Sequence, residues 1–204
     1  MRQISLAAAS LIASFALVGH ALADADDIAT LMQDTCAHCH GETGDASSRT
    51  YPRLAAQNRA YLEKQLRNFR DGTRVSDIMN GMAEPLTDGQ IVALAEFFSA
   101  QPAQKHRVRS SKQSLAAVGA YIYHEGNEFT QIPPCADCHG EFAAGDENLP
   151  RLAGQHRHYV LEQLQAFESG TRTNDHAIMH SIAKNLTELE MNAVALYVSG
   201  LGEE

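Results

Sequence analysis

The chain has 204 residues, enough for one large domain or two small ones, and its 25 acidic residues outnumber its 16 Lys and Arg. The resulting net charge of −9 argues against nucleic acid as a partner. The acids lie in residues 24–104 and 113–204, whereas residues 105–112 contain four Lys and Arg and no acid. This distribution predicts two acidic units joined by a short basic linker. The net acidic surface suggests a partner with a positive docking patch, and a solvated acidic face is the ordinary alternative.

Residues 1–23 have the features of a leader. Arg2 gives a positive start, an apolar run covers residues 4–18, and Ala21-Leu22-Ala23 supplies a small-x-small cleavage pattern. This arrangement is typical of a secretory signal peptide that is cut after Ala23. A retained membrane anchor is the alternative, but the apolar run is short for a span of about 20 residues. We therefore expect an exported mature protein that is soluble or at most peripheral to a membrane.

The first chemical motif is Cys36-Ala37-His38-Cys39-His40, which follows a helix expected around Ile28 to Met32. Cys-x-x-Cys-His is the attachment pattern for c-type haem. Two thiols add across the two haem vinyl groups, and the adjoining imidazole can then bind the iron. The pattern recurs at Cys135-Ala136-Asp137-Cys138-His139, after a helix expected around Leu115 to Tyr123.

The two motifs use all four cysteines of the chain. Two disulfides, or one four-cysteine zinc site, would not require a histidine directly after each pair. A thioredoxin-like redox pair would need a strand-helix-strand pattern that neither motif has. The sequence therefore predicts two covalent haem c groups and their proximal iron ligands. The residues concerned are Cys36, Cys39, Cys135 and Cys138 for attachment, and His40 and His139 for the irons.

The two halves match well beyond the motifs, at an offset that stays between 98 and 100 residues. Two repeats of this size predict a two-domain protein and not a solenoid. We expect a first domain over residues 24–104, a linker over 105–112 and a second domain over 113–204. The matching segments are Pro-Arg-Leu-Ala-x-Gln (52–57, 150–155), Tyr-x-x-x-Gln-Leu-x-x-Phe (61–69, 159–167), Gly-Thr-Arg (72–74, 170–172) and Ile-Met (78–79, 178–179).

Both halves are expected to be helical. Apolar residues recur at helical spacing from Asn58 onward, and Gly72 stops that run; the second half repeats the pattern and stops at Gly170. Thr87-Asp88 and Thr187-Glu188 are typical starts of a further helix in each half. The chain lacks alternating strand patterns and hairpin turns. These patterns predict an all-α fold of two tandem domains, each wrapped around one haem that completes its small core.

The ligand opposite each proximal histidine decides between a closed electron-transfer site and an open catalytic one. Met79 and Met179 occupy matching places in the repeat, in loops between the two apolar helices, and we assign them as distal ligands. Met82 competes with Met79, although its counterpart is Ile182. His176 and His180 flank Met179, lack histidine counterparts, and are interpreted as exposed loop residues. Four further histidines are interpreted as surface or local hydrogen-bonding residues: His106, His124, His156 and His158.

Together these segments resemble the dihaem cytochrome c4 family over essentially the whole mature chain. The resemblance implies two class I cytochrome c domains related by a pseudo-twofold axis, with haem propionates near their interface. It also implies periplasmic electron transfer, from a quinol-oxidising complex toward a haem–copper terminal oxidase, with Met79 and Met179 as distal ligands. The first domain departs from the family pattern, because the helix before Cys36 lacks the glycine and aromatic residues that Gly119, Tyr121 and Tyr123 give the second.

Two other functions are weighed against an electron carrier without substrate chemistry. The cytochrome subunit of a flavin-containing sulfide dehydrogenase would have the same haem residues and a flavoprotein partner. A dihaem peroxidase-like enzyme would need an open iron with acid or base residues above it. His176 or His180 could supply such a group, but Met179 lies where it would block access. The sequence therefore favours the electron carrier.

Overall fold

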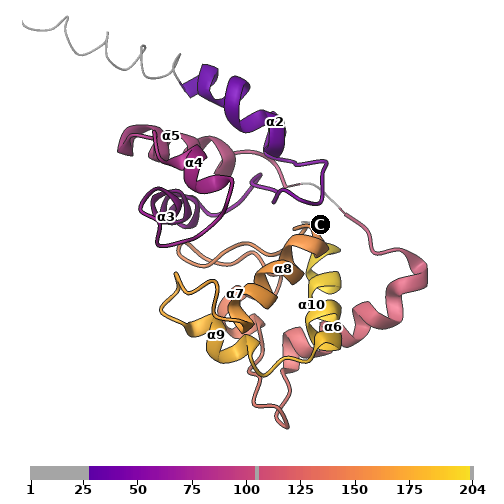
Figure 1. The fold of residues 1–204 in the computed structure, drawn as a ribbon. Coiled ribbons are helices and arrows are strands. Elements are labelled where there is room, and N and C mark those ends of the chain that lie inside the picture. Colours follow the sequence, from indigo (N-terminus) through magenta and orange to yellow (C-terminus); the bar gives the residue numbers. More distant parts are fainter. Residues whose placement is uncertain (1–27, 104–105, 203–204) are drawn as a thin grey trace, which may run out of the picture.

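The computed structural model describes residues 28–103 and 106–202, so the predicted signal peptide lies outside the described residues. Figure 1 shows two helical bodies, one formed by each half of the chain, with the segment around residues 106–112 passing between them along one side. Across the described ranges, no helix has the length and apolar character needed to cross a membrane.

The first half begins with one continuous helical stretch. Residues 28–31 are helical and lead through a π-helical turn, η1 (Met32–Cys36), into α2 (Ala37–His40). The haem-attachment motif therefore lies at the end of this stretch. The remaining helices are α3 (Arg59–Arg70), α4 (Met79–Ala83) and α5 (Asp88–Ser99).

The second half repeats this order after a short 3-10 turn, η2 (Ser110–Lys112). Its helices are α6 (Gln113–Glu125), α7 (Ala136–His139), α8 (Arg157–Glu168), α9 (Ile178–Ala183) and α10 (Glu188–Ser199). Within the described ranges no strand is formed, and the β-type backbone pairing is limited to one isolated antiparallel bridge between Asn127 and Ile132. The all-α prediction is confirmed.

The last helix of each half starts as its sequence predicts. Thr87 and Thr187 are N-caps, and each side chain accepts a hydrogen bond from the backbone N–H three residues later. Gln90 and Glu190 return the contact by accepting from the threonine N–H, at 3.0 and 2.8 Å. These two capping boxes satisfy N–H groups that the first turn of a helix leaves without a partner.

Each half has its own apolar core. Leu62 and Phe69 of α3 pack with Ile91, Leu94 and Phe98 of α5 in the first cluster. The second cluster is formed by α6, α8 and α10 together with the segments between them. Domains of this size bury little apolar surface by themselves, so the prediction that a haem completes each core stands as a prediction. The buried members of the second cluster are Ile122, Tyr123, Ile132, Ala143, Ala153, Val160, Leu164, Leu186, Met191, Val194, Ala195 and Val198.

The helix that leads to the motif packs differently in the two halves. In the second half, α6 approaches α10 so closely that a Cβ at Gly119 would lie 2.1 Å from the carbonyl oxygen of Ala193 and 2.9 Å from Cβ of Tyr197. Only a glycine permits this backbone contact. In the first half the corresponding stretch continues into the motif, and its Met32 is buried in the first core. The departure expected from the missing glycine and aromatic pattern is thus a real difference in packing.

One expectation about local structure is wrong. Met79 and Met179 do not lie in loops: Met79 begins α4, and Met179 is the second residue of α9. Both helices are shorter than two turns, so their apolar positions do not repeat often enough to produce a periodic pattern. Turn residues fix their starts, since the N–H of Met79 donates to Oγ of Ser76 and the N–H of Met179 donates to Oδ2 of Asp175.

Candidate haem sites and the boundary between them

The two predicted proximal histidines have the same environment. His40 and His139 are buried at the ends of α2 and α7, and Nδ1 of each lies within hydrogen-bond distance of a proline carbonyl, Pro52 at 3.0 Å and Pro150 at 3.3 Å. A carbonyl oxygen can only accept, so Nδ1 must carry the proton. In the neutral ring the free lone pair is therefore on Nε2, which is the atom that an iron requires.

Burial also favours the neutral form of these rings. It lowers the pKa of His40 and of His139, although the hydrogen bond to the proline carbonyl acts in the opposite direction in both cases. A neutral imidazole with a fixed tautomer is the form that ligates a metal. Both histidines therefore fit the proximal position of a haem.

One cysteine and one methionine of each half pack against the core of that half. Cys36 and Met79 both pack against the first apolar cluster, and Cys135 and Met179 both pack against the second. All four cysteines are free of disulfides. Burial raises the pKa of Cys36, and it raises that of Cys135 to about 11, so neither is activated as a thiolate. Buried thiols of this kind differ from the activated thiolates of redox sites, whose pKa is lowered.

The assignment of the histidines and methionines as iron ligands remains a prediction. Met82, the competitor of Met79, is exposed, whereas Met79 is half-buried against the core. His176 is exposed, as expected. His180 is not: it is half-buried in α9, and its Nδ1 lies 2.7 Å from the carbonyl oxygen of Phe167. Asn80 makes the equivalent contact with Phe69 in the first half.

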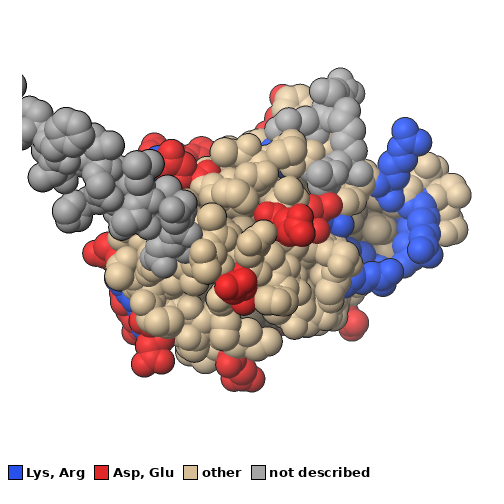
Figure 2. All heavy atoms as spheres, turned by 90° about the horizontal axis from the view of Figure 1, so that it is seen from above, with Lys and Arg blue, Asp and Glu red and all other residues tan. Residues whose placement is uncertain are grey.

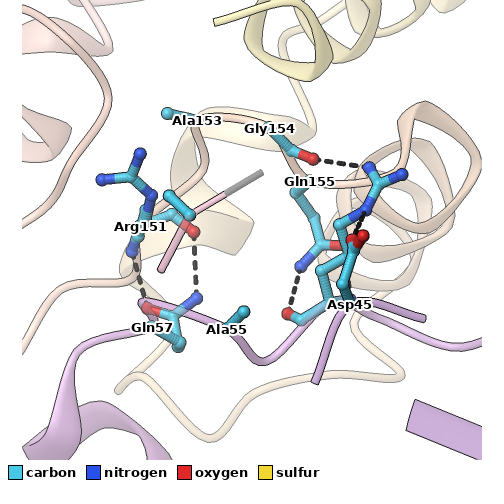
Figure 3. Close-up of a pocket in the computed structure, with 9 residues that line it drawn as sticks. Asp45, Ala55, Gln57, Arg151, Ala153, Gly154 and Gln155 are labelled. Carbon is cyan, nitrogen blue, oxygen red and sulfur yellow. Dashed lines mark hydrogen bonds and ion pairs between the residues drawn. The ribbon is translucent and has the colours of Figure 1, made fainter. Parts of the chain in front are cut away.

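Two reciprocal glutamine contacts join the halves (Figure 3). Nε2 of Gln57 donates to the carbonyl of Arg151 at 3.0 Å, while Oε1 accepts from the N–H of Arg151 at 2.7 Å. Gln155 makes the same two contacts with Arg53, at 2.8 and 2.9 Å. We call Gln57 and Gln155 the glutamine pair. The cavity beside it has a volume of about 20 Å³, room for about one water molecule and too small for a substrate.

A second group of polar contacts crosses the boundary between α3 and α8. Arg74 donates to Tyr159 and Gln163, and Arg172 donates to Tyr61 and Gln65. Both guanidinium groups are buried and lie over phenylalanine rings of their own domain. Burial acts to raise the pKa of Tyr61, but the two guanidinium groups outweigh it and the net pKa is lowered.

This second group is not fully symmetric. Asn174 donates to Gln65 at 3.0 Å and to Asn68 at 2.8 Å across the boundary. Its counterpart Ser76 instead caps α4 within its own domain. The second domain thus contributes an extra pair of hydrogen bonds here.

Sequence reasoning missed most of these boundary residues. His156 was expected at the surface or in local contacts, but it is buried, and its Nε2 lies 2.7 Å from the carbonyl oxygen of Ala46 in the other domain. Asn58, its counterpart, donates to Ala144 and Leu149 across the boundary. The available signal was the repetition of the same Gln, Tyr and Arg at matching positions of the two halves.

Charge on the surface follows the sequence. Figure 2 shows acidic side chains scattered over the face that it presents, whereas Lys and Arg gather at the side where the linker lies. The described basic residues of the linker are all exposed: Arg107, Arg109 and Lys112.

Comparison with known families places a cytochrome in each half. Residues 23–98 match the family model described as "Cytochrome C oxidase, cbb3-type, subunit III", and residues 119–202 match the model described as "Cytochrome c". Each match contains one Cys-x-x-Cys-His motif and one of the two assigned methionines.

Full-length relatives match both halves together. "Cytochrome c4" of Pseudomonas aeruginosa is 34% identical over 197 residues, covering 94% of this chain and 96% of its own. The "Thiosulfate dehydrogenase electron acceptor" of Thiomonas intermedia is 36% identical over 168 residues, covering 81% and 77%. The crystal structure of reduced recombinant cytochrome c4 from Pseudomonas stutzeri superimposes with a TM-score of 0.79 at 31% identity, covering 89% of this chain and 98% of that one.

Proposed function

Because this chain belongs to the dihaem cytochrome c4 family, we propose that it carries electrons one at a time in the periplasm through two haems, each ligated by one histidine and one methionine. The proposed ligands are His40 with Met79 and His139 with Met179. The supporting observations are that one attachment cysteine and one methionine pack against each apolar core, and that each half has a buried histidine whose Nε2 is free.

A covalently held haem with two strong axial ligands supplies a one-electron couple whose coordination changes little between its two states. The residues of the chain hold that group and exclude water from it. The cysteines attach it, the proline carbonyls fix the imidazole rings, and the apolar residues of each core surround it. The hydrogen bonds across the boundary hold the two domains in one arrangement, so that the distance between the two sites stays fixed.

This arrangement does not favour a dihaem peroxidase-like enzyme. Such an enzyme needs an acid or base poised above an open iron. His180 is turned toward the carbonyl of Phe167, and His176 is exposed. Within the described part of the chain, no group of three His, Cys, Asp or Glu residues is placed to hold a further metal ion.

The proposal also names an electron donor and an electron acceptor for this protein. We propose transfer from a quinol-oxidising complex toward a haem–copper terminal oxidase. A second candidate donor is a thiosulfate dehydrogenase, favoured by the 36% identical relative that is named as the electron acceptor of such an enzyme. The flavin-containing sulfide dehydrogenase remains a prediction. In each case the acidic surface fits a partner with a basic docking patch.

Ligation is tested by the near-infrared spectrum of the oxidised protein. A methionine sulfur bound to ferric haem gives a weak charge-transfer band in this region, and we expect an intensity that corresponds to two such haems. A band for one haem, or for neither, would contradict the proposed ligands.

The donor is tested by stopped-flow reduction of the oxidised protein. We expect rapid reduction by a quinol-oxidising complex, with a rate that falls as salt screens the acidic surface. Faster reduction by a thiosulfate dehydrogenase in the presence of thiosulfate would instead assign the second donor.

A further inference from the structure

The glutamine pair connects each domain to the proximal histidine of the other, and we infer that Gln57 and Gln155 are positioning residues that set the potential of the haem in the opposite domain. The inference rests on the proposed function, in which His40 and His139 bind the two irons. Its geometry consists of two short hydrogen-bond chains that cross the boundary in opposite directions. Figure 3 shows the glutamine end of these chains.

In the first domain one peptide group lies between the histidine and the glutamine. Its carbonyl oxygen, on Pro52, accepts from Nδ1 of His40 at 3.0 Å. Its N–H, on Arg53, donates to Oε1 of Gln155 at 2.9 Å. Because a peptide group is planar and conjugated, these two hydrogen bonds lie at the two ends of one rigid unit.

The second domain has the same chain in the opposite direction. The carbonyl of Pro150 accepts from Nδ1 of His139 at 3.3 Å. The N–H of Arg151, in the same peptide group, donates to Oε1 of Gln57 at 2.7 Å. Each chain therefore contains a histidine of one domain and a glutamine of the other.

The two bonds on such a peptide group strengthen each other. An acceptor on the N–H draws electron density toward the carbonyl oxygen, which then accepts more strongly from the imidazole. A stronger hydrogen bond at Nδ1 makes the imidazole a more basic ligand. A more basic ligand stabilises ferric iron relative to ferrous iron, so it lowers the potential of that haem. Both glutamine side chains are buried, at 7% and 6% exposure, so water does not readily replace them.

The resulting expectation is a crossed pattern. Gln155→Leu removes the acceptor from Arg53 and should raise the potential of the first haem, whereas Gln57→Leu should raise that of the second. The glutamine contacts the ligand only through the peptide group, so the expected effect is modest. We expect about a threefold change in the ratio of reduced to oxidised haem at a given potential. At about 59 mV per tenfold change, this corresponds to a shift of about 28 mV in the potential of that haem.

The experiment is a potentiometric titration of the holoprotein carrying each substitution. The two redox waves are assigned to their domains with Met79→Ala and Met179→Ala, each of which displaces one wave. Gln155→Glu and Gln57→Glu keep an oxygen that can accept from the arginine N–H, so the upward shift should be absent in them. Hydrogen exchange at Nδ1–H of the ferrous histidines supplies a second measurement, and it should be faster in the opposite domain of each leucine variant.

Asn174→Ser is the matched control, because it removes boundary hydrogen bonds without touching either proline–arginine peptide group. It should leave both potentials and both Nδ1–H exchange rates unchanged. Shifts confined to the domain that carries the substituted glutamine, no shift at all, or the same shifts in Asn174→Ser would each overturn the inference. Such results would leave the proposed function standing if the wild-type protein still shows two His/Met haems. Loss of those spectra in the wild-type protein would instead contradict the proposed function.

Discussion

The first and second domains share the residues that surround the predicted irons, but they differ in the helix that leads to the attachment motif. Both have a buried histidine bonded to a proline carbonyl, a methionine on a short helix and one member of the glutamine pair. In the second domain α6 packs against α10 through Gly119, whereas in the first a continuous helix runs directly into the motif. The two repeats therefore agree where the haem and the boundary constrain them, and they differ in the outer packing.

The largest expected effect tests the shared part of this comparison. Met79→Ala and Met179→Ala should each leave both haems attached, open one coordination position and lower the potential of one haem. Axial ligands move haem potentials over a span of about 0.8 V, so a fall on the order of 0.2 V is expected. Redox titration with optical detection measures it. If either substitution left both waves in place, the methionine would have been chosen wrongly.

The next effect tests the difference in outer packing. A methyl group at Gly119 would meet the backbone of Ala193 at 2.1 Å, which neither helix can relieve without moving. Gly119→Ala should therefore destabilise the second domain by about 3 kcal/mol, and hydrogen exchange should rise in α6 and α10 but not in α3 and α5.

The matched control is Gly81→Ala in the first domain. A Cβ at Gly81 has no atom within 4 Å, and the residue lies inside α4, so alanine should stabilise this helix by about 0.5–1 kcal/mol. Equal destabilisation by both substitutions would remove the distinction between the two domains.

A smaller effect concerns acid stability of the last helices. Burial acts to raise the pKa of Glu190, but hydrogen bonds from the backbone N–H of Thr187, the side chain of Asn127 and the Thr187 hydroxyl outweigh it and lower the pKa below 4.5. The stabilisation is present above the unfolded pKa and is lost as the pH falls through the folded one. Gln90 at the same place in the first domain does not titrate.

As the pH falls below about 4.5, hydrogen exchange in α10 should therefore rise before that in α5. Glu190→Gln makes the two capping boxes alike and should abolish this extra acid sensitivity. An undiminished difference between α10 and α5 in that variant would assign the sensitivity to another group.

The smallest effect is expected at the surface of the first domain. Hydrogen bonds from Arg70 and Arg67 lower the pKa of the exposed carboxylate of Asp88. The ion pairs of Asp88 therefore stabilise the folded state at pH values above its usual pKa of 3.8, and this stabilisation is lost as the pH falls through the lowered pKa. Asp88→Asn should slightly speed hydrogen exchange at the start of α5 in low salt and have no effect in high salt. A salt-independent effect would point to capping and not to the ion pairs.

Much of the fold could be predicted from the sequence, because the patterns involved are local. Thr87 and Thr187 start helices, and the Cys-x-x-Cys-His motifs need only five adjacent residues. The short helices that carry Met79 and Met179 lack enough turns to show a period. The glutamine pair is visible in the sequence as a repeated Gln, but its contacts join residues 94 and 102 positions apart. Such contacts depend on how the two folded domains pack against each other, and a local sequence pattern does not predict this packing.

The central claim is that the chain holds two closed one-electron sites. One combined measurement tests it most directly: mass spectrometry of the purified mature protein, followed by a potentiometric titration of the same sample with and without cyanide. We predict a mass equal to the chain from Asp24 plus two haems, two one-electron waves, and no cyanide-induced change at low concentration. A single haem, or a wave that low cyanide displaces, would contradict this account.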